Sequence, residues 1–168
     1  MPFSLKTTKH LLTATLLSLF LISCGFHLKQ SASISSSFGP ASIEGISTQS
    51  TLYKAIRNIL KSSDIKISAA SSANNRVIIS GDNYERKVLS VDSSGKVSEY
   101  ELIRTLSFAA LNSSGDTVIE SQSLAANRYY TVNTNEVLSD DFEEQDLRRL
   151  MDEELADRMF RYISAQIR

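Results

Sequence analysis

The side chains that could do covalent or acid–base chemistry in this chain are few, and their spacing supports no catalytic centre. The 168 residues contain one cysteine, Cys24, and two histidines, His10 and His27. We expect His10 to be lost with an N-terminal signal segment, and His27 lies only three residues beyond Cys24, where it cannot easily face a preformed pocket. Neither a Cys–His pair nor a Ser–His–Asp triad can therefore be assembled. We expect a protein that is not an enzyme.

Metal and phosphate chemistry also lack their usual residues. Clustered carboxylates could hold a metal ion, and the only such run comprises Asp140, Asp141, Glu143 and Glu144. Because these acids open a predicted helix, capping and the helix dipole explain them better than a metal does. The glycines stand singly in predicted turns, so no Gly-rich phosphate loop is present. We expect neither a metal nor a bound cofactor.

The residues around Cys24 form the most informative motif in the chain. Lys6 and Lys9 precede an uncharged apolar run from Leu11 to Ile22, which suits a signal peptide and is short for a transmembrane helix. The sequence Leu21-Ile22-Ser23-Cys24-Gly25 then resembles a bacterial lipobox, with a small residue directly before the cysteine and a leucine two places further upstream.

The lipobox predicts cleavage before Cys24 and covalent lipid on it. Residues 1–23 would then be a lipoprotein signal peptide, and Cys24 would carry a diacylglycerol and an N-acyl chain. The alternatives are an ordinary signal peptide with an incidental cysteine, or a truncated membrane anchor. Acylation is favoured because a lone free thiol makes little sense in an oxidising compartment.

The charge of the remaining chain excludes some partners. Removal of residues 1–23 leaves 145 residues with 16 basic and 19 acidic side chains, a net charge of −3. A net negative charge does not suit nucleic-acid binding, which calls for a strongly basic surface. It also argues against charge-driven binding to anionic lipid, so acyl chains would supply most of the membrane attachment. Lipoproteins with Asp after the acylated cysteine commonly stay in the inner membrane, so Gly25 favours the outer membrane.

The patterns that follow Cys24 predict a tether and then one domain. We interpret residues 24–38, serine-rich from Ser31 to Ser37, as a flexible tether, and residues 39–168 as a single domain. A short strand is expected over Ala41–Ile46. Apolar residues at helical spacing predict a helix over Thr51–Ser62.

Three long strands joined by tight turns are expected next. The first runs from Val77 to Val91, with a bulge near Gly81, and the third from Thr117 to Val132. The middle strand lies between the turns at Asp92–Gly95 and Asn112–Asp116. In the middle strand Tyr100, Leu102, Leu106 and Phe108 point to one face, while Glu99, Glu101, Thr105 and Ser107 point to the other. The pattern predicts an antiparallel meander with one solvated face.

The C-terminal segment predicts a long amphipathic helix. It is capped by Asp140 or Asp141, and its apolar stripe comprises Leu147, Met151, Leu155, Met159, Tyr162 or Ile163, and Ile167. The predicted fold class is therefore α+β: an antiparallel sheet of three long strands and a short first strand, with two helices packed on one face.

Two further groups of residues could contact partners. Arg128-Tyr129-Tyr130 ends the last strand with side-chain types that are enriched at protein interfaces. Packing of the rings on the core edge, with the arginine in solvent, explains them equally well. Arg86, Lys87 and Lys96 flank the first hairpin turn, and an ordinary cross-strand pair of Lys87 with Glu101 is the alternative to a functional role there.

Taken in order, several segments make the chain resemble the LptE family of lipopolysaccharide-assembly lipoproteins. They are Cys24-Gly25-Phe26-His27-Leu28, Leu52-Tyr53-Lys54-Ala55-Ile56-Arg57-Asn58, Gly95 with Glu99-Tyr100-Glu101-Leu102, Arg128-Tyr129-Tyr130, and Glu144-Gln145-Asp146. The resemblance implies a plug, at 1:1, inside the LptD β-barrel of the outer membrane, held by a periplasmic-side lipid anchor. It also implies support for the barrel's assembly and binding of lipopolysaccharide for delivery to the outer leaflet. The rival hypothesis is a generic outer-membrane lipoprotein that scaffolds another envelope machine.

The resemblance also identifies candidate lipid contacts. The family often has basic residues at the hairpin tip and in the loop before the last helix, where this chain has Ser93 and Asp140 and Asp141. Lys96, and less directly Arg86 and Lys87, are the bases that could contact lipopolysaccharide phosphates here.

Overall fold

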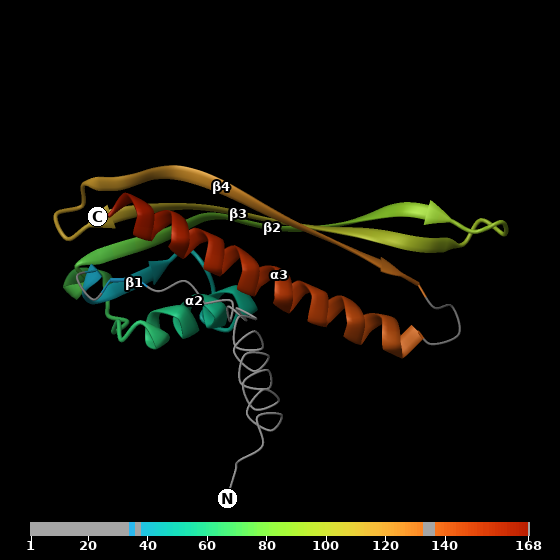
Figure 1. The fold of residues 1–168 in the computed structure, drawn as a ribbon, viewed down its shortest axis with the longest axis horizontal. Coiled ribbons are helices and arrows are strands. Elements are labelled where there is room, and N and C mark those ends of the chain that lie inside the picture. Colours follow the sequence, from blue (N-terminus) through green and yellow to red (C-terminus); the bar gives the residue numbers. More distant parts are fainter. Residues whose placement is uncertain (1–33, 36–37, 133–136, 168) are drawn as a thin grey trace, which may run out of the picture. The chain divides into compact units, whose positions relative to one another are not determined.

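The computed structural model describes residues 34–35, 38–132 and 137–167, with side chains in the last segment described from residue 141. The predicted signal peptide, Cys24 and most of the predicted tether lie outside the described residues. The described elements, in chain order, are β1 (Ala41–Glu44), α2 (Thr51–Ser62), the short 3₁₀ helix η2 (Ala70–Ser72), β2 (Asn75–Val91), β3 (Val97–Asn112), β4 (Thr117–Thr131) and α3 (Val137–Gln166) (Figure 1).

These strands form one sheet in the order β1-β2-β3-β4. The three long strands pair antiparallel, with Lys87 opposite Glu101 as expected and a register shift at Gly81. The short β1 instead pairs parallel with β2, Ala41 lying opposite Asn75. The connection through α2 is long enough for the crossover that a parallel pair needs. The α+β class is confirmed, and the sheet contains one parallel pair.

Local signals set the boundaries of α2. The Ser50 hydroxyl accepts a hydrogen bond from the Tyr53 N–H at 3.1 Å and caps the first turn. At the other end Asp64 takes a left-handed conformation with φ 58°, and the Ile65 N–H donates to the Leu60 carbonyl at 2.9 Å. The helix therefore spans the predicted residues.

The two hairpin turns are stabilised by the same kind of side-chain hydrogen bond. The Asp92 carboxylate accepts the backbone N–H groups of Ser94 and Lys96 at 2.8 and 2.9 Å. The Asn112 side-chain oxygen does the same for Ser114 and Asp116, both at 2.9 Å. Each turn closes with a glycine at positive φ, the conformation that glycine adopts without steric cost.

The helix α3 begins at Val137, before the predicted caps, and packs with α2 on one face of the sheet (Figure 1). The predicted stripe is confirmed, because its central members are fully buried: Met151, Leu155, Met159 and Ile163. Alternation along β3 is confirmed as well, with Leu102, Leu106 and Phe108 in the same core. None of the helices in the described ranges is long and apolar enough to cross a membrane.

The core also includes two residues of the predicted tether. Ile34 is 6% exposed and Phe38 is 2% exposed, and both belong to the main hydrophobic cluster. The Asn75 side-chain amide donates to the Phe38 carbonyl at 2.6 Å and fixes this part of the chain beside β2. The packed domain therefore begins by Ile34, upstream of the boundary at residue 39 that composition indicated.

Candidate functional site

Four side chains meet where the β2–β3 hairpin leaves the helix-covered part of the sheet. The Glu144 carboxylate, from α3, accepts hydrogen bonds from Tyr84 at 2.6 Å, Arg86 at 2.8 Å and Tyr130 at 3.0 Å. Tyr84 and Arg86 lie on β2, and Tyr130 lies near the end of β4. We call these four residues the Glu144 cluster, and it joins β2 to β4 and α3, which come much later in the sequence.

Aromatic and cationic contacts extend this cluster. The rings of Tyr100 and Tyr130 stack with centroids 5.5 Å apart. The guanidinium of Arg86 lies 4.6 Å from the Tyr100 ring centre, and that of Arg148 lies 3.8 Å from the Tyr84 ring centre. Aromatic rings and charged side chains thus alternate in the contacts between α3 and the base of the β2–β3 hairpin.

The protonation states in the cluster follow from burial and hydrogen bonding. Burial, followed by the hydrogen bond to Glu144, raises the pKa of Tyr130 to about 12 and also raises the pKa of Tyr84. Burial would raise the pKa of Glu144, but the hydrogen bonds from Tyr84, Arg86 and Tyr130 outweigh it, so this pKa lies below its usual value. At neutral pH a carboxylate therefore accepts from two neutral phenols and a guanidinium.

A second polar cluster lies deeper in the domain, and the sequence analysis did not find it. Arg104 on β3 forms ion pairs with Asp82 at 2.5 Å and with Asp152 on α3 at 2.8 Å, and Thr51 at the start of α2 donates to Asp152. Asp152 is only 2% exposed. Burial raises the pKa of Asp82. The available signal was Arg104 itself, because it occupies the core-facing phase of its strand.

The structure separates the three bases that were predicted to contact lipid. Arg86 faces the helices and binds Glu144, while Lys87 is exposed on the opposite face of the sheet, 3.7 Å from Glu85. Lys96 lies in the exposed hairpin turn, where its backbone N–H donates to Asp92. Lys96 and Lys87 are thus available to a ligand, whereas Arg86 is already engaged within the domain.

The Arg128-Tyr129-Tyr130 segment is also divided between the two faces. Arg128 pairs with Glu154 of α3 at 2.5 Å, and Tyr130 is buried in the Glu144 cluster. Tyr129 is 61% exposed on the open face of the sheet beside Glu101. Of the three residues, Tyr129 is the one that presents a large surface to a partner.

An exposed apolar patch lies at the end of the hairpin, which projects beyond β4 (Figure 1). Val88, Leu89 and Val91 are each more than half exposed. Sequence alternation did not reveal this patch, because register shifts between Val88 and Val91 change which face the side chains occupy.

The acidic run at the start of α3 provides no metal site among the residues that the structure describes. No group of three His, Cys, Asp or Glu side chains there is arranged to hold a metal ion. The Asp140 side chain lies outside the described residues, Asp141 is exposed, and Glu144 is used by its own cluster.

Solved structures of bacterial lipoproteins share this fold. Rare lipoprotein B from Shewanella oneidensis matches with a TM-score of 0.65 and 24% identity, over 76% of this chain and 95% of the other. A minor lipoprotein from Acinetobacter baumannii matches with a TM-score of 0.63 and 23% identity, over 76% and 92%. An uncharacterized lipoprotein B from Nitrosomonas europaea matches with a TM-score of 0.66 and 20% identity, over 84% and 91%. The fold is therefore one that bacterial lipoproteins use.

Sequence comparison identifies the family. Among curated proteins, none matches this chain. The model of the LptE family, described as lipopolysaccharide-assembly, matches residues 32–163. The chain belongs to the LptE family, which confirms the resemblance and assigns it to lipopolysaccharide assembly.

Proposed function

We propose that this protein is a non-catalytic, lipid-anchored partner of an LptD-like outer-membrane β-barrel. It occupies the barrel lumen as a plug at 1:1, supports the barrel's assembly, and contacts lipopolysaccharide on its way to the outer leaflet. The observation that carries this proposal is the LptE family match over residues 32–163, nearly the whole described domain.

The open face of the sheet supports the plug role. It is exposed and mostly polar; its side chains include Asn83, Glu85, Lys87, Ser123 and Asn127. The lumen of a large outer-membrane barrel is polar and hydrated, so such a face suits it. The Glu144 cluster and the ion pairs of Arg104 join α3 to the sheet, and the Thr51–Asp152 hydrogen bond joins α2 to α3. A plug needs that internal rigidity.

Attachment to the membrane is assigned to Cys24. Each acyl methylene that enters the bilayer contributes about 0.8 kcal/mol, and stable anchoring requires more than one chain. A diacylglycerol together with an N-acyl chain on Cys24 meets that requirement. Mass spectrometry of the native protein tests this part directly, and a cleaved but unmodified Cys24 would refute it.

Co-purification from native membranes tests the plug role. The tagged full-length protein should bring down one large β-barrel at 1:1. A matched pair of variants sharpens the test: Tyr129→Ser on the open face should weaken the association, and Tyr53→Ser on α2 should not. Recovery of a different envelope assembly without a barrel would favour the general scaffold instead.

Lipopolysaccharide contact is assigned to Lys96 and Lys87, because Arg86 is engaged with Glu144. The double variant Lys87→Ser/Lys96→Ser should bind lipopolysaccharide more weakly and with less dependence on salt, while stability and barrel association persist. Arg149→Ser/Arg161→Ser removes two exposed charges from α3 and serves as control. Equal affinity of both double variants at two ionic strengths would place the lipid contact elsewhere.

A further inference from the structure

The outer face of α2 carries an unpaired basic surface that the proposed function does not use. Lys54, Arg57 and Lys61 recur at i, i+3 and i+7 on the helix, Lys66 follows in the next loop, and all four are exposed. None forms an ion pair with another described residue. We call these four residues the α2 patch.

This pattern differs from the rest of the described chain. Most other basic side chains there lie beside a carboxylate; they are Arg76, Arg86, Lys87, Arg104, Arg128, Arg149, Arg158 and Arg161. Between Thr51 and Ile67 four cations face a single acid, Asp64, although the whole chain has a formal net charge of −1. The overall charge therefore conceals a local positive surface.

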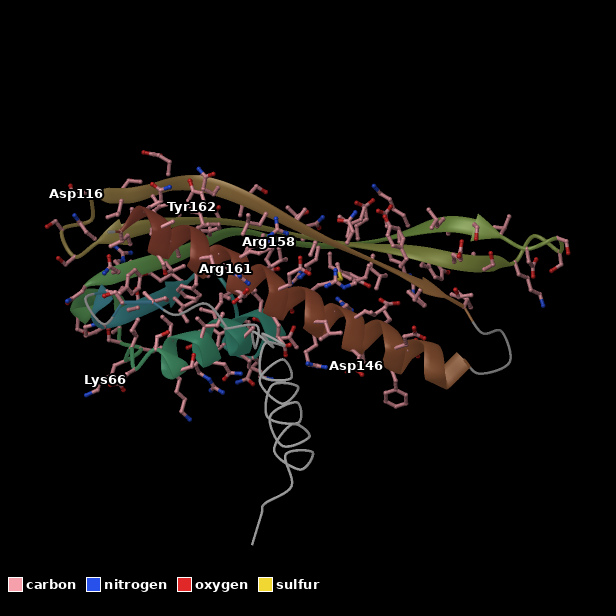
Figure 2. The ribbon with its side chains drawn as sticks, viewed as in Figure 1. Lys66, Asp116, Asp146, Arg158, Arg161 and Tyr162 are labelled. Carbon is pink, nitrogen blue, oxygen red and sulfur yellow. The ribbon has the colours of Figure 1, made fainter. Side chains whose placement is uncertain are left out.

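The α2 patch also borders a hollow in the protein surface. The hollow has a volume of about 300 Å³ and is lined by Arg57, Lys61, Asp64, Ile65, Lys66 and Ile67. Ile67 is 37% exposed beside these charges, and Lys66 points away from the sheet (Figure 2). Cations around an apolar floor suit a ligand with anionic and hydrocarbon parts side by side.

The α2 patch lies near Ile34, the first described residue after the proposed anchor at Cys24. The Ile34 N–H donates to the Ser63 hydroxyl at 3.2 Å, directly after the last turn of α2. Ten residues connect Cys24 to Ile34, and even a fully extended segment of that length reaches only about 35 Å. An acylated Cys24 would therefore keep the end of α2, with Lys61 and Lys66, within that distance of the membrane surface.

We propose that the α2 patch binds the phosphate headgroups of anionic phospholipids in the leaflet that holds the Cys24 anchor. This inference rests on the proposed lipid anchoring. The anchor supplies attachment, and the patch holds the anchor-side end of the plug against the same leaflet, at the mouth of the proposed barrel. Each basic residue near an anionic surface contributes about 1 kcal/mol, a factor of about five in partitioning.

Amine labelling of the full acylated protein on vesicles tests the proposal. Vesicles of phosphatidylcholine alone are compared with vesicles that also contain phosphatidylglycerol, and labelled lysines are quantified by mass spectrometry. Lys54, Lys61 and Lys66 should react about fivefold more slowly on the anionic vesicles and recover at high salt. Lys96, in the hairpin turn, should not change. Equal reactivity of the patch lysines on both vesicles would overturn the proposal.

A matched pair of variants isolates the patch. In Arg57→Ser/Lys61→Ser/Lys66→Ser, the remaining Lys54 should lose its protection on anionic vesicles. In Arg149→Ser/Arg158→Ser/Arg161→Ser, which removes the same charge from α3, Lys54 should stay protected. Protection of Lys54 in both variants, or protection that requires the co-purified barrel and not anionic lipid, would also overturn the proposal.

Failure of the anchor is distinguished by flotation. An acylated protein floats with phosphatidylcholine vesicles whatever the patch does, so absence of flotation contradicts the anchor. The comparison of lysine labelling on the two vesicle types then still tests lipid binding by the α2 patch separately.

Discussion

Glu144 is the residue on which contacts between α3 and the hairpin converge. One carboxylate receives two phenols and a guanidinium from β2 and β4. Because Tyr130 also stacks on Tyr100, and Arg86 lies over that ring, the same contacts order the aromatic side chains at the base of the hairpin. The base of the hairpin is therefore joined to α3 through this one carboxylate.

Replacing this acid should weaken the domain in a pH-dependent way. Glu144→Gln should lower the free energy of unfolding by about 1.5–3 kcal/mol at neutral pH, the range for hydrogen bonds to a charged group. The folded-state pKa of Glu144 lies below its ordinary value, so its stabilisation is present above the unfolded pKa of about 4.3. It is lost as the pH falls through the folded-state pKa. Urea unfolding at neutral and acidic pH measures this; a difference between the proteins that does not shrink in acid would contradict it.

Arg104 should be the more sensitive position. Arg104→Met leaves the buried Asp152 and the neighbouring Asp82 without their counter-charge, and breaking one partner of a buried pair costs about 3–5 kcal/mol. Arg149→Met, which breaks only exposed pairs on α3, should cost about 0–1 kcal/mol. Adding Asp152→Leu to Arg104→Met should restore part of the loss in chemical unfolding; no recovery would argue against a charge effect.

At the scale of elements, α3 makes the contacts that fix the helical layer on the sheet. Its buried stripe faces the sheet core, while Asp152 and Glu144 on the same helix bind side chains from β2, β3 and β4. Apolar packing and two polar clusters thus fix its rotation together. A helix held in this way cannot roll without breaking both kinds of contact.

Two identical substitutions test this orientation. Leu155→Asp places an unpaired charge at a fully buried position, whereas Leu150→Asp places it where the side chain is 43% exposed. Leu155→Asp should destabilise the domain by about 4 kcal/mol, and Leu150→Asp by less than about 1 kcal/mol. Thermal unfolding by circular dichroism compares them, and similar melting temperatures would refute the assigned face.

Sequence predicts those elements whose signals are local. Ser50, Asp92 and Asn112 each act within four residues of themselves, so α2 and both turns were predicted with their boundaries. The parallel pairing of β1 and the burial of Ile34 and Phe38 depend on Ser63, Asn75 and the core, which are distant in the chain.

For the candidate site, Arg86 and Tyr130 were recognised by type, but their meeting with Glu144 depends on strand register and on the position of α3. Arg104 and Asp152 were missed, because a charged side chain in a strand or helix is first interpreted as solvated.

At the scale of the whole molecule, the core requires the segment upstream of residue 39. Phe38→Ala should cost about 3–5 kcal/mol, as for other buried aromatic residues, because Phe38 is 2% exposed. Phe142→Ala, at a position 69% exposed, should change stability by less than about 0.5 kcal/mol. Chemical unfolding of the two variants measures the difference, and equal stabilities would mean that the packed domain begins later in the chain.

The parallel pairing of β1 with β2 has a consequence for the order in which the domain folds. β2, β3 and β4 are joined by tight turns, so their contacts close short loops, while Ala41 must find Asn75 across a much longer one. We expect the meander to form first and β1 to be added last, although β1 is nearer the N-terminus. Native-state hydrogen exchange should then show β1 opening at a lower free energy than β3. As the most N-terminal strand of the described domain, β1 would then be the last strand to form and the first to open. The β2–β3 hairpin would be complete while this end of the domain is still open.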